Sequence, residues 1–238
     1  MQVADPSSVA NQEVFYPSED GEPLAESYDH LYAILVTLEV LRQYLQGQRA
    51  TVLADQFLYY AQGFPRLRVA PDVMVIFGVE PGGRDNFKVW QEGAVPSVIF
   101  EMTSKGTQQI DQTHKYCLYA QLGVQEYWLF DPKGEWLDSP LMGYRLNGDD
   151  YVAIEDGCSQ VLGLRLEVEG KLIGFTEIET GRRLPMPAEL SQELEKERQR
   201  ADQASRWAEA ERLKAEQQAQ RAERLRAQLQ ALGIDPVE

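Results

Sequence analysis

Two short apolar runs that each carry one acidic residue are the most informative pattern in this chain. They cover residues 71–77 and 98–104, and β-branched and aromatic side chains fill both of them. Runs of this kind are typical of buried β-strands. The first contains Asp72 and the second Glu101, where a strand core is expected to be apolar. Singly, Asp72 could cap a turn and Glu101 could pair with an arginine, but two such acids together favour a shared site.

The pattern before these runs is helical. In residues 26–45 the apolar positions recur at helical spacing and fall on one broad face. Glu39 lies near the middle of that face. We expect a helix here, ended by Gly47 as a C-terminal cap, with this face directed at the core. The positions that define the face are Tyr28, Leu31, Tyr32, Leu35, Leu38 and Leu45.

The remaining pattern up to residue 187 predicts more strands than helices. Strand-like runs occupy 51–53, 56–60, 67–70, 72–79, 97–103 and 126–130, and a helix is expected over 109–122. Hairpin-type turns then join 141–146 to 151–154 and 164–168 to 171–175. This order of elements predicts an α/β (α+β) fold with a mixed central sheet flanked by helices.

The C-terminal region differs from the rest of the chain in composition. No Pro or Gly interrupts residues 190–232, and Leu or Ala fills ten of the thirteen positions spaced alternately four and three apart from Leu190 to Leu232. That spacing is typical of a coiled coil, although a single solvated helix held by charge pairs is the alternative. We therefore expect three parts: a flexible or extended segment (1–25), a folded domain (26–187) and a helical tail (188–238) that forms a homo-oligomer through residues 188–232.

The charge distribution restricts the partners of the domain. The chain has a formal net charge of −15, and its first 187 residues carry 27 acids against 14 bases. Domains that bind duplex nucleic acid are usually basic. A nucleic-acid function here must therefore rely on a local basic patch or on bound divalent cations. The N-terminus resembles no signal peptide and no run could span a bilayer, so we expect a cytoplasmic protein with Cys117 and Cys158 reduced.

The two strand acids suit one particular cofactor. Mg²⁺ takes oxygen ligands and is commonly held by one or two carboxylates together with waters and phosphate oxygens. Asp72 and Glu101 on neighbouring strands would supply such ligands for Mg²⁺ (or Mn²⁺). The ion would activate a water molecule, and a nearby lysine would stabilise the charge that develops on a phosphoryl group.

The order of several short motifs resembles the Uma-type restriction endonuclease family of the PD-(D/E)xK nuclease superfamily. The resemblance covers about residues 26–187 and implies a restriction-endonuclease-like core with a divalent metal at the strand acids. It makes Asp72 the first acid and Glu101 the second. The motifs are Pro71-Asp72, Glu101-x-x-Ser104, Asp111-x-x-x-Lys115-x-x-x-Tyr119 and Gly123-Val124-x-Glu126-Tyr127-Trp128-x-x-Asp131-Pro132.

The lysine departs from the simplest pattern of the superfamily. Thr103 stands two residues after Glu101, where that pattern has lysine. The resemblance places the lysine on the following helix, at Lys115, although an ion pair with Asp111 one helical turn earlier would also account for it. Lys105 is the rival candidate, but it lies in a predicted turn and is expected to be solvated.

The resemblance also assigns Glu39 to an acid on the first helix that many of these nucleases use as an additional metal-site residue. Partly buried pairing with an arginine is an equal alternative for Glu39. The two histidines, His30 and His114, lack metal-ligand spacing, and we expect them at the surface or in helix packing.

These observations together predict a Mg²⁺-dependent endonuclease acting on DNA, with Asp72 and Glu101 as metal ligands, Lys115 as the stabilising cation and Glu39 completing the site. Two alternatives stay open. One is a binding or assembly module that keeps the fold without cleaving nucleic acid, which the acidic charge and the tail favour. The other is a metal-dependent hydrolase of a small phosphorylated substrate.

Overall fold

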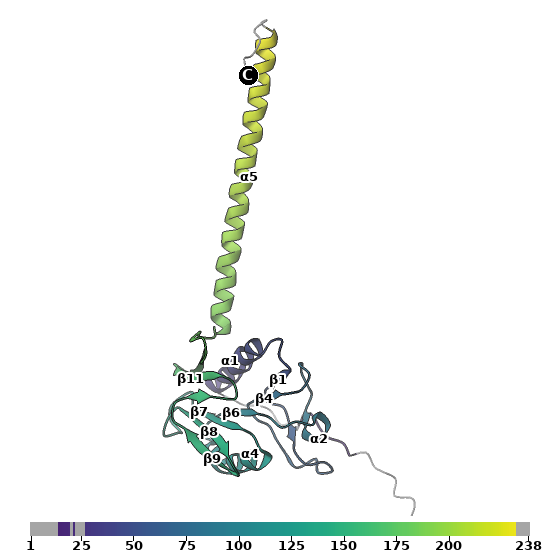
Figure 1. Ribbon diagram of the computed structural model, residues 1–238, viewed down its shortest axis with the longest axis vertical. Helices are drawn as coiled ribbons and strands as arrows, with labels where there is room; N and C mark the ends of the chain where they lie inside the picture. Colours follow the sequence, from purple (N-terminus) through teal and green to yellow (C-terminus); the bar gives the residue numbers. More distant parts are fainter. Residues whose placement is uncertain (1–13, 20, 22–26, 232–238) are drawn as a thin grey trace, which may run out of the picture. The chain divides into compact units, whose positions relative to one another are not determined.

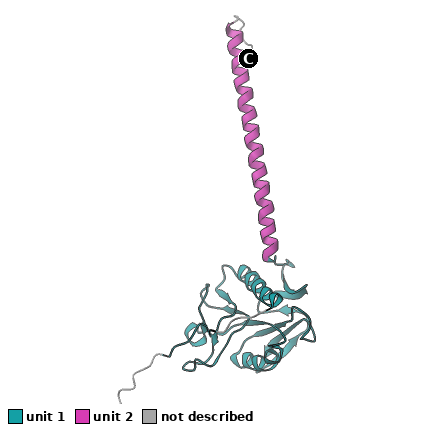
Figure 2. Cartoon of the chain, turned by 180° about the vertical axis from the view of Figure 1, so that it is seen from behind, with its two compact units in different colours: residues 1–186 teal, residues 187–238 magenta. Residues whose placement is uncertain are grey.

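The computed structural model of the protein describes residues 14–19, 21 and 27–231 (Figure 1). The chain divides into two units, residues 1–186 and 187–238 (Figure 2). Most of the predicted N-terminal segment (1–25) lies outside the described residues. The division into 1–25, 26–187 and 188–238 stays a prediction.

A six-stranded sheet forms the centre of the first unit. Its order is β1-β4-β6-β7-β8-β9, and only the β6–β7 pair within it is parallel. The strands are β1 (Ala50–Leu53), β4 (Val73–Phe77), β6 (Val98–Met102), β7 (Glu126–Phe130), β8 (Leu141–Asn147) and β9 (Asp150–Ile154). The predicted mixed sheet is therefore confirmed.

Two small sheets of three strands accompany the central one. The first contains β10 (Cys158–Ser159), β11 (Leu164–Glu169) and β12 (Leu172–Glu177). The second contains β2 (Leu58–Tyr59), β3 (Arg68–Val69) and β5 (Phe87–Lys88), followed by the short helix α2 (Val89–Glu92). The strand pattern predicted neither β5 nor β10.

The two faces of the central sheet are buried against different elements. Helix α1 (Tyr28–Tyr44) covers the face to which Val73, Val75 and Phe100 point, and β11 and β12 add to the same core. The opposite face, with Met74 and Ile99, packs on α4 (Tyr116–Leu122). Because both faces are covered, β4, β6 and β7 are buried along nearly their whole length, which explains their continuous apolar sequence.

The expected buried face of α1 is wrong at four of its six positions, Tyr28, Leu31, Tyr32 and Leu35, whereas Leu38 and Leu45 do pack in the core. Tyr28 is 75% exposed and Leu35 is 51% exposed, and the rings of Tyr28 and Tyr32 stack on each other at the surface. The helix instead buries smaller and more polar side chains. These are His30, Ala33, Ile34, Val36, Thr37, Val40 and Leu41.

The predicted helix over 109–122 is present but not regular. It consists of α3 (Gln108–Ile110), a turn of π-helix η1 (Asp111–Lys115) and α4, ended by Gly123 in a left-handed conformation (φ 82°). A π turn contains one more residue than an α turn and is frequently found at functional sites. Here it carries Asp111 and Lys115, two residues of the predicted motif.

The second unit is the helix α5 (Pro187–Ala231), 45 residues long. Its side chains are exposed almost throughout, including Trp207 at 71% and Leu194 at 72%. Ion pairs such as Arg212–Glu216 link successive turns. None of the described helices is long and apolar enough to cross a membrane.

Candidate functional site: two strand acids, a lysine and a tyrosine

The register between β4 and β6 brings the two strand acids together. Val73 lies opposite Phe100 in this antiparallel pair, so the next position, Asp72, lies opposite Glu101. Side chains alternate along a strand, which places Asp72 on the side of Met74 and Glu101 on the side of Ile99. Both acids therefore belong to the face that α4 covers.

Two side chains from the helical segment after β6 hold the carboxylate of Glu101. Lys115 Nζ lies 2.7 Å from Glu101 Oε2, and Tyr119 donates its hydroxyl hydrogen to Glu101 Oε1 at 2.7 Å. Glu101 is 1% exposed. A carboxylate oxygen has more than one lone pair, so each oxygen keeps the capacity to accept a further contact.

Lys115 also contacts a third carboxylate. Its Nζ lies 3.1 Å from Asp111 Oδ1, and the Asp111 side chain is 1% exposed. The ion pair considered as the alternative for Lys115 thus exists, but it adds to the Glu101 contact rather than replacing it. In a regular α-helix, side chains four residues apart drift by about 40°. The wider π turn offsets that drift, so Asp111, Lys115 and Tyr119 can face the same strand.

Asp72 is held from two other elements. Its Oδ2 accepts a hydrogen bond from the Met102 backbone N–H at 2.5 Å, and His30 Nε2 lies 3.6 Å from the same oxygen. His30 is 4% exposed and is the first buried side chain of α1. The expectation that His30 serves in helix packing is met only in part, because its ring also faces the first strand acid.

The electrostatics of the cluster reflect an excess of negative charge in a dry site. Burial, and then the charge of Glu101, raises the pKa of Asp72 well above its usual value. Burial likewise raises the pKa of Glu101, although Lys115 acts in the opposite direction. Burial lowers the pKa of Lys115, but the nearby carboxylates outweigh it and raise that pKa overall. Lys115 therefore stays charged at neutral pH.

The donor set fits a divalent cation held by few protein ligands. Within the described part of the chain, no three His, Cys, Asp or Glu side chains cluster closely enough to hold a metal ion. Mg²⁺ does not require three, because one or two carboxylates and several waters commonly suffice. The repulsion between Asp72 and Glu101, visible in the raised pKa of Asp72, is what a cation between them would relieve.

The other predicted site residues lie differently. Glu39 is half-buried on α1 and accepts a hydrogen bond from Gln43 on its own helix at 3.1 Å. Its role in the site stays a prediction. Lys105 is exposed in the turn after β6, as expected, and is not among the contacts of Glu101.

The sequence analysis did not predict two residues of the cluster as site residues, Tyr119 and His30. Tyr119 was part of the quoted motif, and its spacing of four residues from Lys115 is the signal that would have placed it beside Glu101. His30 precedes Asp72 by 42 positions, and only the packing of α1 across the end of β4 brings the two together. No local pattern indicates that contact.

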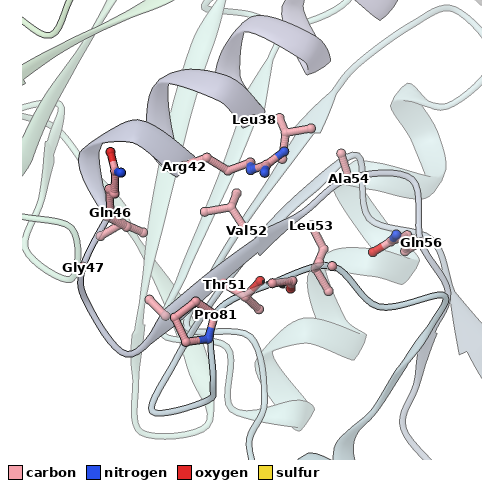
Figure 3. A pocket seen from close by; sticks show the side chains of 14 residues that line it. Leu38, Arg42, Gln46, Gly47, Thr51, Val52, Leu53, Ala54, Gln56 and Pro81 are labelled. Atoms are coloured by element: carbon pink, nitrogen blue, oxygen red, sulfur yellow. Dashed lines mark hydrogen bonds between the residues drawn. The ribbon is translucent and has the colours of Figure 1, made fainter.

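Two pockets lie near these elements. One of about 240 Å³ is bordered by Thr103 and by His30, the residue that lies 3.6 Å from Asp72. The other, of about 340 Å³, lies at the C-terminal end of α1, where Leu38 and Arg42 lie across from Val52 of β1 (Figure 3). None of the four predicted site residues lines this second pocket.

The mixed sheet flanked by helices, with its paired acids and lysine, is the architecture expected of a restriction-endonuclease-like protein. The chain belongs to the family described as "Uma2: Putative restriction endonuclease", whose model matches residues 11–170. This confirms the family resemblance found in the sequence.

The comparison with individual proteins adds little detail. No curated protein is similar enough in sequence to count as a match. One similar solved structure is the crystal structure of a putative nuclease belonging to DUF820 from Anabaena variabilis, at 15% identity and a TM-score of 0.44. The similarity covers 68% of this chain and 80% of that one.

Proposed function

We propose that this protein is a divalent-metal-dependent endonuclease that hydrolyses phosphodiester bonds of DNA. The observation that carries the proposal is the cluster on β4 and β6, in which Asp72 lies opposite Glu101 and Lys115 reaches Glu101 at 2.7 Å. Membership of the Uma2 family supports the same reaction class.

The residues of the cluster have different roles in the proposal. Asp72 and Glu101 would hold Mg²⁺ or Mn²⁺, which in such sites polarises the phosphoryl group and supplies an activated water molecule. Tyr119 and Lys115 fix the orientation of Glu101, while Met102 and His30 fix that of Asp72. Each acid is therefore positioned before substrate binds.

Lys115 has a second role in the proposal. Because its pKa is raised, it is a permanent positive charge and not a proton acceptor at neutral pH. A fixed cation beside the reacting phosphate stabilises the negative charge that builds up in the transition state. We assign to Lys115 that electrostatic function.

The acidic composition of the domain agrees with a metal-dependent mode of binding. With 27 acids against 14 bases in the first 187 residues, the domain as a whole repels nucleic acid. Bound divalent cations and local basic groups must therefore supply the attraction to phosphate. We expect DNA affinity to be weak when Mg²⁺ is absent.

We also propose that α5 pairs with the same helix of a second copy. Nine of the twelve positions of the four-three register that lie within α5 are Leu or Ala, and a 45-residue helix with an exposed surface gains area by pairing. Cleavage of both strands of a duplex needs two active sites, which a dimer provides.

The test is cleavage of supercoiled plasmid and single-stranded DNA in Mg²⁺ or Mn²⁺, with metal binding measured by calorimetry. Wild type is compared with Asp72→Asn and Lys115→Gln, and with Asp85→Asn, an exposed acid, as the matched control. We expect Asp72→Asn to lose metal binding and both site variants to lose roughly 100-fold or more in rate, since one electrostatic contact is worth that much in other enzymes.

Other outcomes separate the alternatives. Metal binding without cleavage of either DNA substrate would shift the assignment to another phosphate substrate. A folded wild type that neither binds metal nor cleaves DNA would refute the enzyme assignment and leave the assembly module.

A further inference from the structure

The pocket of about 240 Å³ next to Asp72 has no role in the cluster itself. None of Asp72, Glu101 and Lys115 lines it, although His30 borders the pocket and lies 3.6 Å from Asp72 Oδ2. The pocket lies between the start of α1 and the segments that follow β6 and β7. Its lining residues are Ser27, His30, Thr103, Ser104, Lys105, Gly106, Pro132, Lys133 and Trp136.

The lining is cationic in an acidic protein. Lys105 and Lys133 both border the pocket, and no aspartate or glutamate is among the lining residues. The chain has only seven lysines among 238 residues and a net charge of −15. The lining of this pocket is therefore positively charged although the chain as a whole is negatively charged. A positively charged lining is what the binding of an anionic group requires.

A buried hydroxyl adds a polar group that lacks a partner. Thr103 is 2% exposed, and its Oγ1 has no hydrogen-bond partner among the described residues. A buried polar group without a partner is costly, and a hydroxyl can donate to an anionic oxygen. Thr103 borders the pocket and stands where the superfamily pattern has lysine.

The start of α1 reinforces the preference for an anion. Ser27 caps this 17-residue helix and borders the pocket. Backbone N–H groups at a helix N-terminus carry partial positive charge and commonly bind phosphate. Asp29 in the first turn opposes this effect, but Lys171 Nζ lies 2.7 Å from its carboxylate and compensates that charge.

The size of the pocket limits what it can hold. Pockets that enclose drug-sized ligands have volumes of roughly 300–1,000 Å³. At about 240 Å³, this one lies below that range and has room for a small group such as a single phosphate. We propose that it binds one backbone phosphate of the nucleic acid, next to the phosphate that is cleaved at Asp72 and Glu101. The identity of the ligand as nucleic acid rests on the proposed function.

Inorganic phosphate is the direct probe, and Trp136 is the reporter because it borders the pocket. We would label the full-length protein with 5-fluorotryptophan, assign the Trp136 ¹⁹F signal with Trp136→Phe, and titrate phosphate against chloride at constant ionic strength with EDTA present. The variants are Lys105→Gln/Lys133→Gln and Thr103→Val. Lys196→Gln/Lys214→Gln removes the same charge from exposed sites on α5 and is the matched control.

Wild type and control are expected to show a saturable shift of the Trp136 signal with equal affinity. The double lysine variant should bind phosphate at least about tenfold more weakly, and Thr103→Val about threefold or more, as charged and neutral hydrogen bonds differ in strength. No saturable shift in wild type would overturn the proposal, and so would unchanged affinity in Lys105→Gln/Lys133→Gln.

A second measurement separates this proposal from the proposed function. In DNA cleavage, Lys105→Gln/Lys133→Gln should raise KM by about tenfold or more, because it removes a binding contact and leaves the metal site intact. Phosphate binding in a protein that does not cleave DNA would refute the nuclease and keep the phosphate site. Cleavage that depends on Asp72, with KM unchanged in the double lysine variant, would refute the subsite and keep the nuclease.

Discussion

Replacement of Lys115 by methionine tests whether the cluster is held together as a buried charge network. Methionine keeps most of the length of the side chain and removes the ammonium group. Glu101 and Asp111, each with a side chain 1% exposed, then lose the cation that lies within 3.1 Å of both. The variant isolates the charge from the packing.

The expected loss of stability is large. Breaking a buried ion pair by removing one partner costs about 3–5 kcal/mol, because the remaining charge stays desolvated. For a domain of 150–250 residues, each kcal/mol lowers Tm by about 2–4 °C, so the first unit should melt about 6–20 °C earlier. The matched control is Lys196→Met, at an exposed position of α5, where we expect almost no change.

The loss of stability in Lys115→Met should also depend on pH. Burial already raises the pKa of Glu101 in the wild type, and Lys115 is the first group that lowers it. Without Lys115 that pKa rises further above the value in the unfolded chain. A carboxyl with a raised folded pKa destabilises the fold above that pKa, and the penalty disappears as the pH falls through it. Lys115→Met should therefore lose more stability at pH 8 than at pH 5.

Thermal and urea denaturation at both pH values measure these effects. Adding Glu101→Gln to Lys115→Met removes one of the buried carboxylates that lost its cation. This should restore at least about 1 kcal/mol of the free energy of unfolding, as coupled neighbours do in double-mutant cycles. A loss below about 1 kcal/mol in Lys115→Met, or no recovery in the double variant, would refute the account of the cluster as a charge network.

Three further predictions concern the metal, the sheet and the tail. Mg²⁺ at a hundred times its Kd should stabilise wild type by about 2.7 kcal/mol and Asp72→Asn hardly at all, so equal Tm shifts in both would contradict the metal site. Gly143→Ala places a Cβ less than 3 Å from three atoms of the Trp128 ring and should cost about 1–3 kcal/mol, whereas Gly83→Ala, where a Cβ meets nothing within 4 Å, should cost less in the same urea melts. Removal of residues 188–238 should yield a monomer by light scattering, and an unchanged oligomer would exclude pairing through α5.

The local sequence was sufficient to predict the two strands at which the acids lie. β4 and β6 are buried on both faces, so their sequences are continuous apolar runs in which Asp72 and Glu101 are conspicuous. Their proximity follows from one antiparallel pairing between strands that follow each other in the central sheet. The roles of these acids stay predictions, but their positions follow from local pattern and simple topology.

The orientation of α1 did not follow from local pattern, because two of its faces are apolar. Tyr28 and Leu35 are larger than Ala33 and Thr37, so a count of hydrophobicity favours the face that the structure leaves exposed. Close packing on the sheet requires the smaller side chains. The same orientation directs His30 toward Asp72, and a single sequence contains no sign of either requirement.

The π turn at Asp111–Lys115 could not be predicted from the sequence either. Its residues have no composition that distinguishes them from an ordinary helix, and the spacing of four between Asp111 and Lys115 suits both. The wider turn is favoured by what surrounds it: Lys115 must reach Glu101 and Asp111 at the same time. Tertiary contacts therefore decide the local helix type.

The length of α5 has a consequence for how a dimer could meet DNA. At 1.5 Å per residue, its 45 residues extend over about 68 Å, which equals about 20 base pairs of duplex at 3.4 Å each. If two such helices pair in parallel, their Pro187 ends lie side by side, and the proposed nuclease would act with both of its sites at one locus. If they pair in antiparallel fashion, those ends are separated by about two turns of the double helix, and the proposed nuclease would cut at two positions that far apart.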